Sequence, residues 1–185
     1  MSLTRRAALA ACLLPFVVAL PTEASAGQRI LGIDQTGKPV ADAQQAGWKL
    51  VYFGYTHCPD VCPLGLQTMA EALDALGPLG ARLTPIFVTV DPDRDTTEVM
   101  ANYVTFFHPR LVGVTPSTEE LKAMAAAWRV KYAKVEIGEG RPYLMDHTAS
   151  IFLIDAEGVV AGRLSHNMPS DQMAAKIRTV LEPRS

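Results

Sequence analysis

The sequence predicts an α/β fold in which helices cover both faces of a central mixed sheet, with a small hairpin at the N-terminal end. Two observations support this prediction. Short apolar runs typical of buried strands alternate with segments whose apolar residues recur at helical spacing, as in mainly parallel sheets. Near the end of the chain, two strand-like runs flank a turn that ends in glycine, which adds an antiparallel pair.

The first half of the chain is expected to hold the hairpin, two core strands and one helix. Residues 30–40 (ILGIDQTGKPV) place a glycine turn between two short runs, which predicts the hairpin. Residues 49–53 and 83–90 are apolar and partly aromatic, as in buried strands. Between them, residues 63–76 carry apolar side chains at helical spacing and stop before a Gly-Pro pair, which predicts a helix.

The second half is expected to hold three helices, a short strand and a second hairpin. Residues 95–98 (DTTE) form a variant of the capping box, with Asp95 as the cap, and predict a helix through Phe106. Residues 117–120 (STEE) form the standard box and predict a helix through Trp128. The remaining elements are a strand at 111–114, a hairpin formed by 151–154 and 159–163, and a helix at 170–181 that Ser170 is expected to cap.

Residues 1–26 are expected to direct export rather than to fold with the rest of the chain. A positive pair at 5–6 precedes the apolar run 7–20, and residues 24–26 (ASA) are typical of a cleavage site. The run is shorter than the roughly 20 apolar residues that a membrane-spanning helix needs, although an uncleaved leader would still serve as a membrane anchor. The arginine pair leaves a twin-arginine export route open. Residues 27–185 are then one domain.

Composition sets broad limits on function. The chain has 185 residues, of which 49% are hydrophobic and 19% are charged, and this suits one globular domain beside the leader. A formal net charge of -2 provides no basic surplus for binding nucleic acid. Of the three cysteines, Cys12 lies in the leader, so a mature chain keeps Cys58 and Cys62.

Cys58 and Cys62 lie where the first core strand is expected to pass into the first helix. Unpaired N–H groups and the dipole at a helix N-terminus stabilise a thiolate. A disulfide between the two would close a loop too short to stabilise the fold much, which argues against a purely structural bond. Such a pair can bind a soft metal ion, form a redox-active disulfide, or alternate between these states. Because proline is favoured at the first helical position, Pro63 predicts that Cys62 lies at the cap and Cys58 in the turn before it.

His147 is the third ligand that we expect for a metal ion. The dithiol after the first core strand and the late hairpin resemble a thioredoxin-like fold, in which the segment entering that hairpin lies against the dithiol loop. Two thiolates and an imidazole suit Cu(I) and also accept Cu(II), whereas zinc would normally require a fourth ligand or water. Asp146 is expected to orient the imidazole. The alternative is that His147 is a loop histidine with no ligand role.

Other potential ligands are expected to have different roles. Met145 suits core packing better than coordination. Residues 91–96 (DPDRDT) could be mistaken for an acidic metal loop, but Arg94 among the aspartates favours an internal ion-pair network that supports the site. The histidines not expected to act as ligands are His57, exposed beside the dithiol; His108, at a helix end; and His166, in a surface turn.

Three motifs resemble, in order and spacing, the signature blocks of the Sco/SenC family. They are residues 52–63 (YFGYTHCPDVCP), 90–96 (VDPDRDT) and 146–148 (DHT). The likeness extends over most of the chain, from about residue 30 to residue 181. The resemblance implies a copper-binding assembly factor whose metal ligands are Cys58, Cys62 and His147.

The resemblance also implies a role and a location. Such proteins deliver copper, carried as Cu(I), Cu(II) or both, to the dinuclear CuA centre of cytochrome c oxidase, reduce the cysteines of that centre, or do both. Expected partners are the copper-bearing subunit of the oxidase and other copper-handling or thiol-redox proteins, not nucleic acid. Family members are usually anchored in a membrane. The bacterial-style leader favours export to the periplasm, with attachment to the inner membrane left open.

Two other functions stay open at this point. The dithiol of Cys58 and Cys62 could serve as the redox-active centre of a thiol–disulfide oxidoreductase, or a copper-responsive redox sensor could use the same ligands with a different partner. We expect a carrier rather than a turnover enzyme, with thiol–disulfide reductase activity left open. The oxidoreductase has no use for His147 as a ligand, so replacing that residue separates the two functions.

Overall fold

The computed structural model describes residues 28–40 and 46–182, and the predicted leader at residues 1–26 lies outside them. Within the described residues, six strands form one mixed sheet in the order β1–β4–β3–β2–β7–β8, and two further strands form a separate sheet. The main sheet contains β1 (Ile33–Asp34), β2 (Trp48–Gly54), β3 (Leu83–Thr89), β4 (Val112–Thr115), β7 (Ser150–Ile154) and β8 (Val160–Ser165). The separate sheet contains β5 (Tyr132–Val135) and β6 (Leu144–His147).

The strand pairing confirms the predicted mixed sheet. β2 and β3 are parallel neighbours, and β4 runs parallel on the far side of β3. β7 runs antiparallel to β2 and to β8, as expected for the late hairpin. At the other edge, β1 is antiparallel to β4, so the predicted N-terminal hairpin is joined to the main sheet through its first strand. A bridge from Ile33 to Pro39 closes that hairpin over the turn at Gly37, whose φ is 81°.

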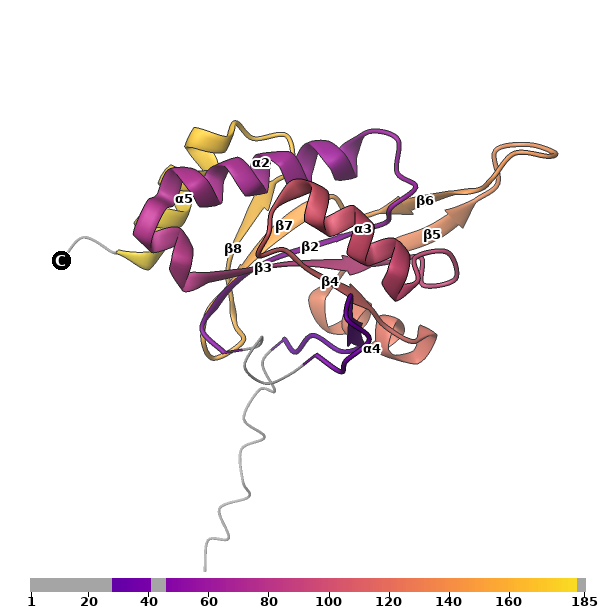
Figure 1. The fold of residues 1–185 in the computed structure, drawn as a ribbon, viewed down its shortest axis with the longest axis horizontal. Helices are drawn as coiled ribbons and strands as arrows, with labels where there is room; N and C mark the ends of the chain where they lie inside the picture. The colour runs from indigo at the N-terminus through magenta and orange to yellow at the C-terminus, as the bar shows by residue number, and fades with distance from the viewer. Residues whose placement is uncertain (1–27, 41–45, 183–185) are drawn as a thin grey trace, which may run out of the picture.

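Helices cover both faces of this sheet, as predicted. They are α2 (Val61–Leu76), α3 (Thr97–Phe107), α4 (Thr118–Trp128) and α5 (Ser170–Leu181), with the short 3-10 helix η1 (Gly77–Arg82) after α2. Figure 1 shows α2 and α5 together on one face and α4 on the other. Successive residues of β2 explain this arrangement, because Tyr52 lies against Gly65 of α2 whereas the Phe53 ring packs against Trp128 of α4.

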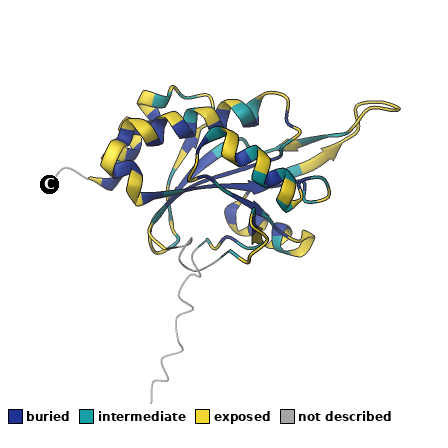
Figure 2. Cartoon of the chain, viewed as in Figure 1, coloured by how far each residue is buried: buried dark blue, intermediate teal, exposed yellow. Residues whose placement is uncertain are grey.

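The two central strands form the core. Every residue of β2 from Lys49 to Gly54 is buried, and so is most of β3 (Figure 2). Lys49 is tolerated there because its ammonium group donates to the backbone carbonyls of Gly47 and Asp155. The first core strand therefore ends in a rigid, fully covered position, and the dithiol follows directly.

The start of α2 differs from the prediction. The helix begins at Val61, with Asp60 in the N-cap position, so Cys62 lies inside the first turn rather than at the cap. Pro63 is the third helical residue and not the first. A proline is tolerated there because the N–H groups of the first turn have no acceptor within the helix.

Two other predicted caps were wrong and one is confirmed. Thr96, not Asp95, caps α3, and its side chain accepts from the N–H of Val99. α5 begins at Ser170, so Pro169 occupies the cap position and the serine is the first helical residue. Ser117 caps α4 with the complete reciprocal box that the sequence predicts.

The β5–β6 hairpin was not predicted. In Figure 1 it projects from the body of the domain beyond the carboxyl end of β2. His147 is therefore the last residue of a strand rather than a loop residue. None of the helices in the described residues combines the length and the hydropathy needed to cross a membrane.

Candidate metal and redox centre

Cys58 and Cys62 lie at the junction of β2 and α2, as predicted. Cys58 is in the turn after β2, where its N–H donates to the carbonyl of Tyr55, and its exposed fraction is 9%. Cys62 is fully buried. Both are free thiols in the structure. Both cysteines are therefore buried, Cys62 more completely than Cys58.

Gly54, the last residue of β2, provides the space for Cys62. A Cβ atom at this position would lie 2.6 Å from the Cys62 sulfur and 2.7 Å from the Phe87 ring. Ordinary contacts between such atoms are about 3.5–4.0 Å. The position of the buried sulfur thus depends on the absence of a side chain at residue 54.

His147 meets this sulfur from the separate hairpin. Its Nε2 atom lies 3.3 Å from Sγ of Cys62, and its Nδ1 atom lies 3.3 Å from the carbonyl oxygen of Thr148. Because Nδ1 faces that carbonyl, Nε2 is directed toward the sulfur. Asp146, which was expected to orient the ring, is exposed and does not make that contact. Strand alternation sends neighbouring side chains to opposite faces, so the backbone carbonyl orients the imidazole.

The three groups form a compact set of donors. The ligand atoms of Cys58, Cys62 and His147 all lie within 4.8 Å of one another. With metal–sulfur bonds of about 2.3 Å and metal–nitrogen bonds of about 2.0 Å, donors on one ion lie at most about 4.6 Å apart. The three atoms are therefore close to the separations that one ion requires. Two sulfurs and an imidazole suit a soft or borderline transition metal and not a cation that prefers oxygen.

The two thiols differ in protonation. The Cys62 thiol donates to the Cys58 sulfur, and this hydrogen bond lowers the pKa of Cys58 to about 3. Burial opposes this shift by raising the pKa, whereas smaller contributions from His147 and from the N–H groups of Asp60 and Cys62 lower it further. The same hydrogen bond, together with burial, raises the pKa of Cys62 above its usual range. The two opposite shifts favour the thiolate at Cys58 and the thiol at Cys62. A helix N-terminus favours such a charge.

Two tyrosines form an aromatic wall around the imidazole. The rings of Tyr52 and Tyr55 meet His147 edge-on, with centroids 6.3 Å and 5.8 Å away. Burial, followed by the nearby cysteine charges, raises the pKa of Tyr52 well above its usual range. Tyr52 therefore stays neutral and donates its hydroxyl hydrogen to the carbonyl of Val61 in the first turn of α2.

The other histidines lie where the sequence predicts them. His57 is half-exposed against Asp95, His108 ends α3, and His166 follows β8 with its Nδ1 atom near the carbonyl of Ala149. Met145 packs against the hydrophobic core, as predicted. Over residues 28–40 and 46–182, no second group of three histidine, cysteine or carboxylate ligand atoms comes together in this way.

The polar loop at residues 91–96 contains the predicted ion pair. Arg94 donates from Nε to the carboxylate of Asp91 at 2.5 Å. Tyr143, which the sequence analysis did not single out, donates its hydroxyl hydrogen to the same carboxylate. The glycines at 138 and 140, between two runs of alternating side chains, were the available sign of the hairpin that carries Tyr143.

The fold and the site together define a thioredoxin-like domain in which a dithiol at a helix start faces a histidine from a separate hairpin. A model of the SCO1/SenC family matches residues 20–182. The chain belongs to this family, so the resemblance carried by the three motifs is confirmed.

Related proteins come from animals and plants. "Protein SCO1 homolog, mitochondrial" of Homo sapiens is 40% identical over 151 residues, covering 80% of this chain and 50% of that protein. "Protein SCO1 homolog 1, mitochondrial" of Arabidopsis thaliana is 40% identical over 147 residues, covering 76% of this chain and 44% of that protein. The chain spans about half the length of the curated relatives it matches.

Similar structures confirm the fold class. Arabidopsis thaliana ScoI with copper bound gives a TM-score of 0.79 at 35% identity, covering 86% of this chain and 99% of that one. Bradyrhizobium japonicum ScoI with copper bound gives a TM-score of 0.72 at 37% identity, covering 82% of this chain and 99% of that one.

Proposed function

We propose that this protein is a copper carrier in which Cys58, Cys62 and His147 bind one ion and deliver it to the CuA centre of cytochrome c oxidase. The convergence of two sulfurs and one imidazole nitrogen within 4.8 Å carries this proposal. Two relatives of similar fold, at 35% and 37% identity, have copper bound in their structures, which supports copper as the cargo. The copper-bearing subunit of the oxidase is the proposed partner.

The donors differ in access, which suits release to a partner. Cys62 is fully buried, Cys58 is 9% exposed and His147 is half-buried. An open cavity of about 620 Å³, lined in part by Val130, Tyr132 and Thr148, reaches the imidazole. A receiving protein that offers thiolates and imidazoles can displace Cys58 and His147 first, while Cys62 keeps hold of the ion until the end. Thiolate and imidazole donors hold Cu(I) and also accept Cu(II).

A second function, reduction of a partner disulfide, is favoured by the unequal thiols. The Cys58 thiolate attacks one sulfur of the partner disulfide; a Cys58–partner bond forms, the partner S–S bond breaks, and one partner thiolate leaves. Cys62 then loses its proton and attacks Cys58, which releases the second partner thiol and leaves a Cys58–Cys62 disulfide. Two electrons pass from the dithiol to the partner, and an external thiol reductant must restore the pair. A redox sensor remains a prediction.

The proposed location is the periplasm. The positive pair and short apolar run in residues 1–26 support export, and removal of this leader after residue 26 would leave the domain free of its N-terminal segment. If the leader is retained, it attaches the domain to the inner membrane. Mass spectrometry of the N-terminus of protein isolated from cell fractions separates the two cases.

The test of the copper proposal is metal stoichiometry in the reduced protein. Wild type is compared with Cys58→Ser, Cys62→Ser and His147→Ala, and His166→Ala serves as the control because that histidine lies outside the donor cluster. We expect one tightly held copper per chain in wild type and in the control, and loss of tight binding in the other three. His147→Ala should keep its reaction with small disulfides.

Two results would contradict the proposal. Copper affinity that survives His147→Ala would remove the imidazole from the site. A wild-type protein that holds no copper but cycles its dithiol against a protein disulfide would be a thiol oxidoreductase. Circular dichroism of each variant ensures that lost binding is not lost folding.

A further inference from the structure

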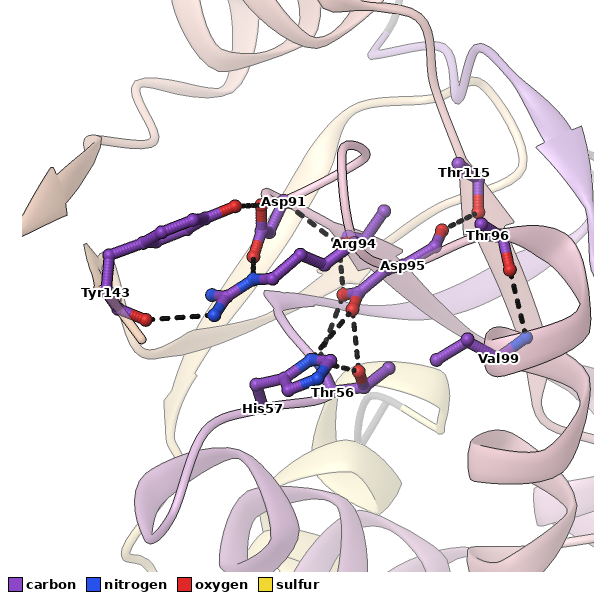
Figure 3. Close-up of polar contacts among 10 residues, drawn as sticks. Thr56, His57, Asp91, Arg94, Asp95, Thr96, Val99, Thr115 and Tyr143 are labelled. Atoms are coloured by element: carbon purple, nitrogen blue, oxygen red, sulfur yellow. Dashed lines mark hydrogen bonds and ion pairs between the residues drawn. The ribbon is translucent and has the colours of Figure 1, made fainter. Parts of the chain in front are cut away.

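The loop between β3 and α3 contacts both segments that carry the proposed donors (Figure 3). At Asp95 it is bonded to Thr56, which lies between the end of β2 and the dithiol. At Asp91 and Arg94 it is bonded to Tyr143, just before β6 and its terminal His147. One short loop therefore connects the dithiol segment to the imidazole segment.

The contact on the dithiol side is a buried carboxylate with several donors. Asp95 is fully buried and accepts from the N–H of Thr56 at 3.0 Å and from its hydroxyl at 2.6 Å. The hydroxyl of Thr89, the last residue of β3, donates to the same carboxylate. Thr56 precedes Cys58 by two residues, so Asp95 fixes the dithiol turn against β3.

The contact on the imidazole side is a guanidinium that binds a tyrosine in two ways. Arg94 donates from Nη1 to the carbonyl oxygen of Tyr143 at 2.9 Å, and its Cζ atom lies 3.6 Å from the centre of the Tyr143 ring. The tyrosine hydroxyl donates to Oδ1 of Asp91 at 2.8 Å, while Nε of Arg94 donates to Oδ2 of the same carboxylate. These bonds close a ring of three side chains at the entry to β6.

The hairpin has few other attachments to the domain. Within the part of the chain that the structure describes, β5 and β6 pair with each other and not with the main sheet. The hydroxyl of Tyr55 is hydrogen-bonded to the backbone of Met145, and Thr148 exchanges bonds with Lys131 below the hairpin. No hydrogen bonds to the main sheet fix the orientation of β6, so it depends on side-chain contacts, which include Met145 against the core and those at the entry to the strand.

We propose that Arg94 and Tyr143 are positioning residues that hold His147 against the dithiol, an inference that rests on the proposed copper site. Neither residue is a donor to the ion. Tyr143 precedes His147 by four residues, and strand β6 transmits its position because an extended strand is stiff over about 13 Å. A planar guanidinium is suited to this contact, since it donates in two directions and stacks on a ring at the same time.

The test uses two conservative variants and one matched control in the full chain. Arg94→Lys keeps the charge and loses the forked geometry, and Tyr143→Phe keeps the ring and loses the bond to Asp91. Lys134→Met is the control, because the Lys134 ammonium also lies over the Tyr143 ring, 4.0 Å from its centre, but is paired with Glu136 rather than with Asp91. Copper affinity is measured by competition with a coloured chelator. The ring nitrogens of His147 are followed by NMR in the metal-free, reduced protein.

We expect Arg94→Lys to weaken copper binding about 10–100-fold, as for other groups that orient a ligand, and Tyr143→Phe to weaken it less. Both variants should shift the His147 ring signals without metal, while the dithiol reacts with a small aromatic disulfide at the wild-type rate. Lys134→Met should change none of these quantities.

Unchanged ring signals in both variants would overturn the inference, as would equal shifts in the control. Copper loss matched by an equally slowed dithiol reaction would also overturn it, because general disruption would then explain both. If wild type binds no copper, the proposed function fails, yet the ring signals of the metal-free protein still decide whether Arg94 and Tyr143 position the histidine.

Discussion

Replacing Gly54 with alanine tests how tightly the Cys62 sulfur is placed. The added Cβ would lie 2.6 Å from that sulfur and 2.7 Å from the Phe87 ring, so one of them must move by about 1 Å to reach ordinary contact. Overpacking of this kind costs about 1–3 kcal/mol. At about 2–4 °C per kcal/mol for a domain of this size, we expect the midpoint of thermal unfolding to fall by about 2–12 °C.

The same displacement should weaken copper binding. Binding groups must be held within about 0.5 Å of their productive geometry, so a shift of about 1 Å at Cys62 should lower affinity at least about tenfold. Thermal unfolding followed by circular dichroism and chelator competition measure the two effects on one sample.

Gly162→Ala is the matched control, because it is also a glycine-to-alanine change within a strand. Its added Cβ meets nothing closer than Leu153 at 3.8 Å, which is an ordinary contact. We expect its stability to lie within about 0.5 kcal/mol of wild type. If Gly54→Ala and Gly162→Ala behave alike in both assays, Gly54 does not set the position of the buried sulfur.

Four further predictions concern charge, capping and buried hydrogen bonds. The lowered pKa of Cys58 keeps it a thiolate at mildly acidic pH, so its rate of alkylation by iodoacetamide should change less than about threefold between pH 6 and 8. The rate of an ordinary thiol would rise more than about 50-fold over the same range. A steep rise for Cys58 would contradict its lowered pKa. Because the pKa of Cys58 is lower in the folded than in the unfolded protein, its stabilisation is fully present above about pH 8.5 and declines as pH falls toward 3. In urea unfolding, Cys58→Ser should therefore lose less free energy of unfolding than wild type over this pH range. Ser117→Ala should cost about 1 kcal/mol through the lost capping box, and an unchanged melting temperature would refute that role. Asp95→Asn should lower the free energy of unfolding in urea by about 1–3 kcal/mol. Both carboxylate oxygens of Asp95 accept hydrogen bonds from Thr56 or Thr89, whereas an amide has only one oxygen that can accept. Equal stability would show that these bonds are dispensable.

The elements of the main sheet were predictable because their periodicity is strong. The runs around Val51 and Ile86 are buried on both faces and read clearly as core strands. The capping box at Ser117 is a local device, completed within four residues, and it was found where the sequence placed it.

The errors arose where distant contacts decide the outcome. The carboxylate of Asp95 is engaged by Thr56 from another segment, which leaves Thr96 to cap α3. No local pattern contains that competition. The β5–β6 hairpin was missed because each strand has only four residues and none of them is buried, so the apolar signal of a core strand is absent.

The orientation of His147 was half predictable. Its motif placed it near the dithiol, but the residue that orients the ring depends on which face of β6 each side chain occupies. Asp146 is adjacent to His147 in sequence, and adjacent side chains of a strand point to opposite faces. The carbonyl of Thr148 orients the ring instead.

The separation of the donors along the chain determines when the complete set can exist. Cys58 and Cys62 are neighbours in sequence, but His147 comes from a hairpin formed much later in synthesis and seated by tertiary contacts. A chain that crosses a membrane unfolded therefore carries only the local pair of thiols. If the chain is exported in this way, the proposed three-donor site forms only after folding on the far side, and the ion would be acquired there.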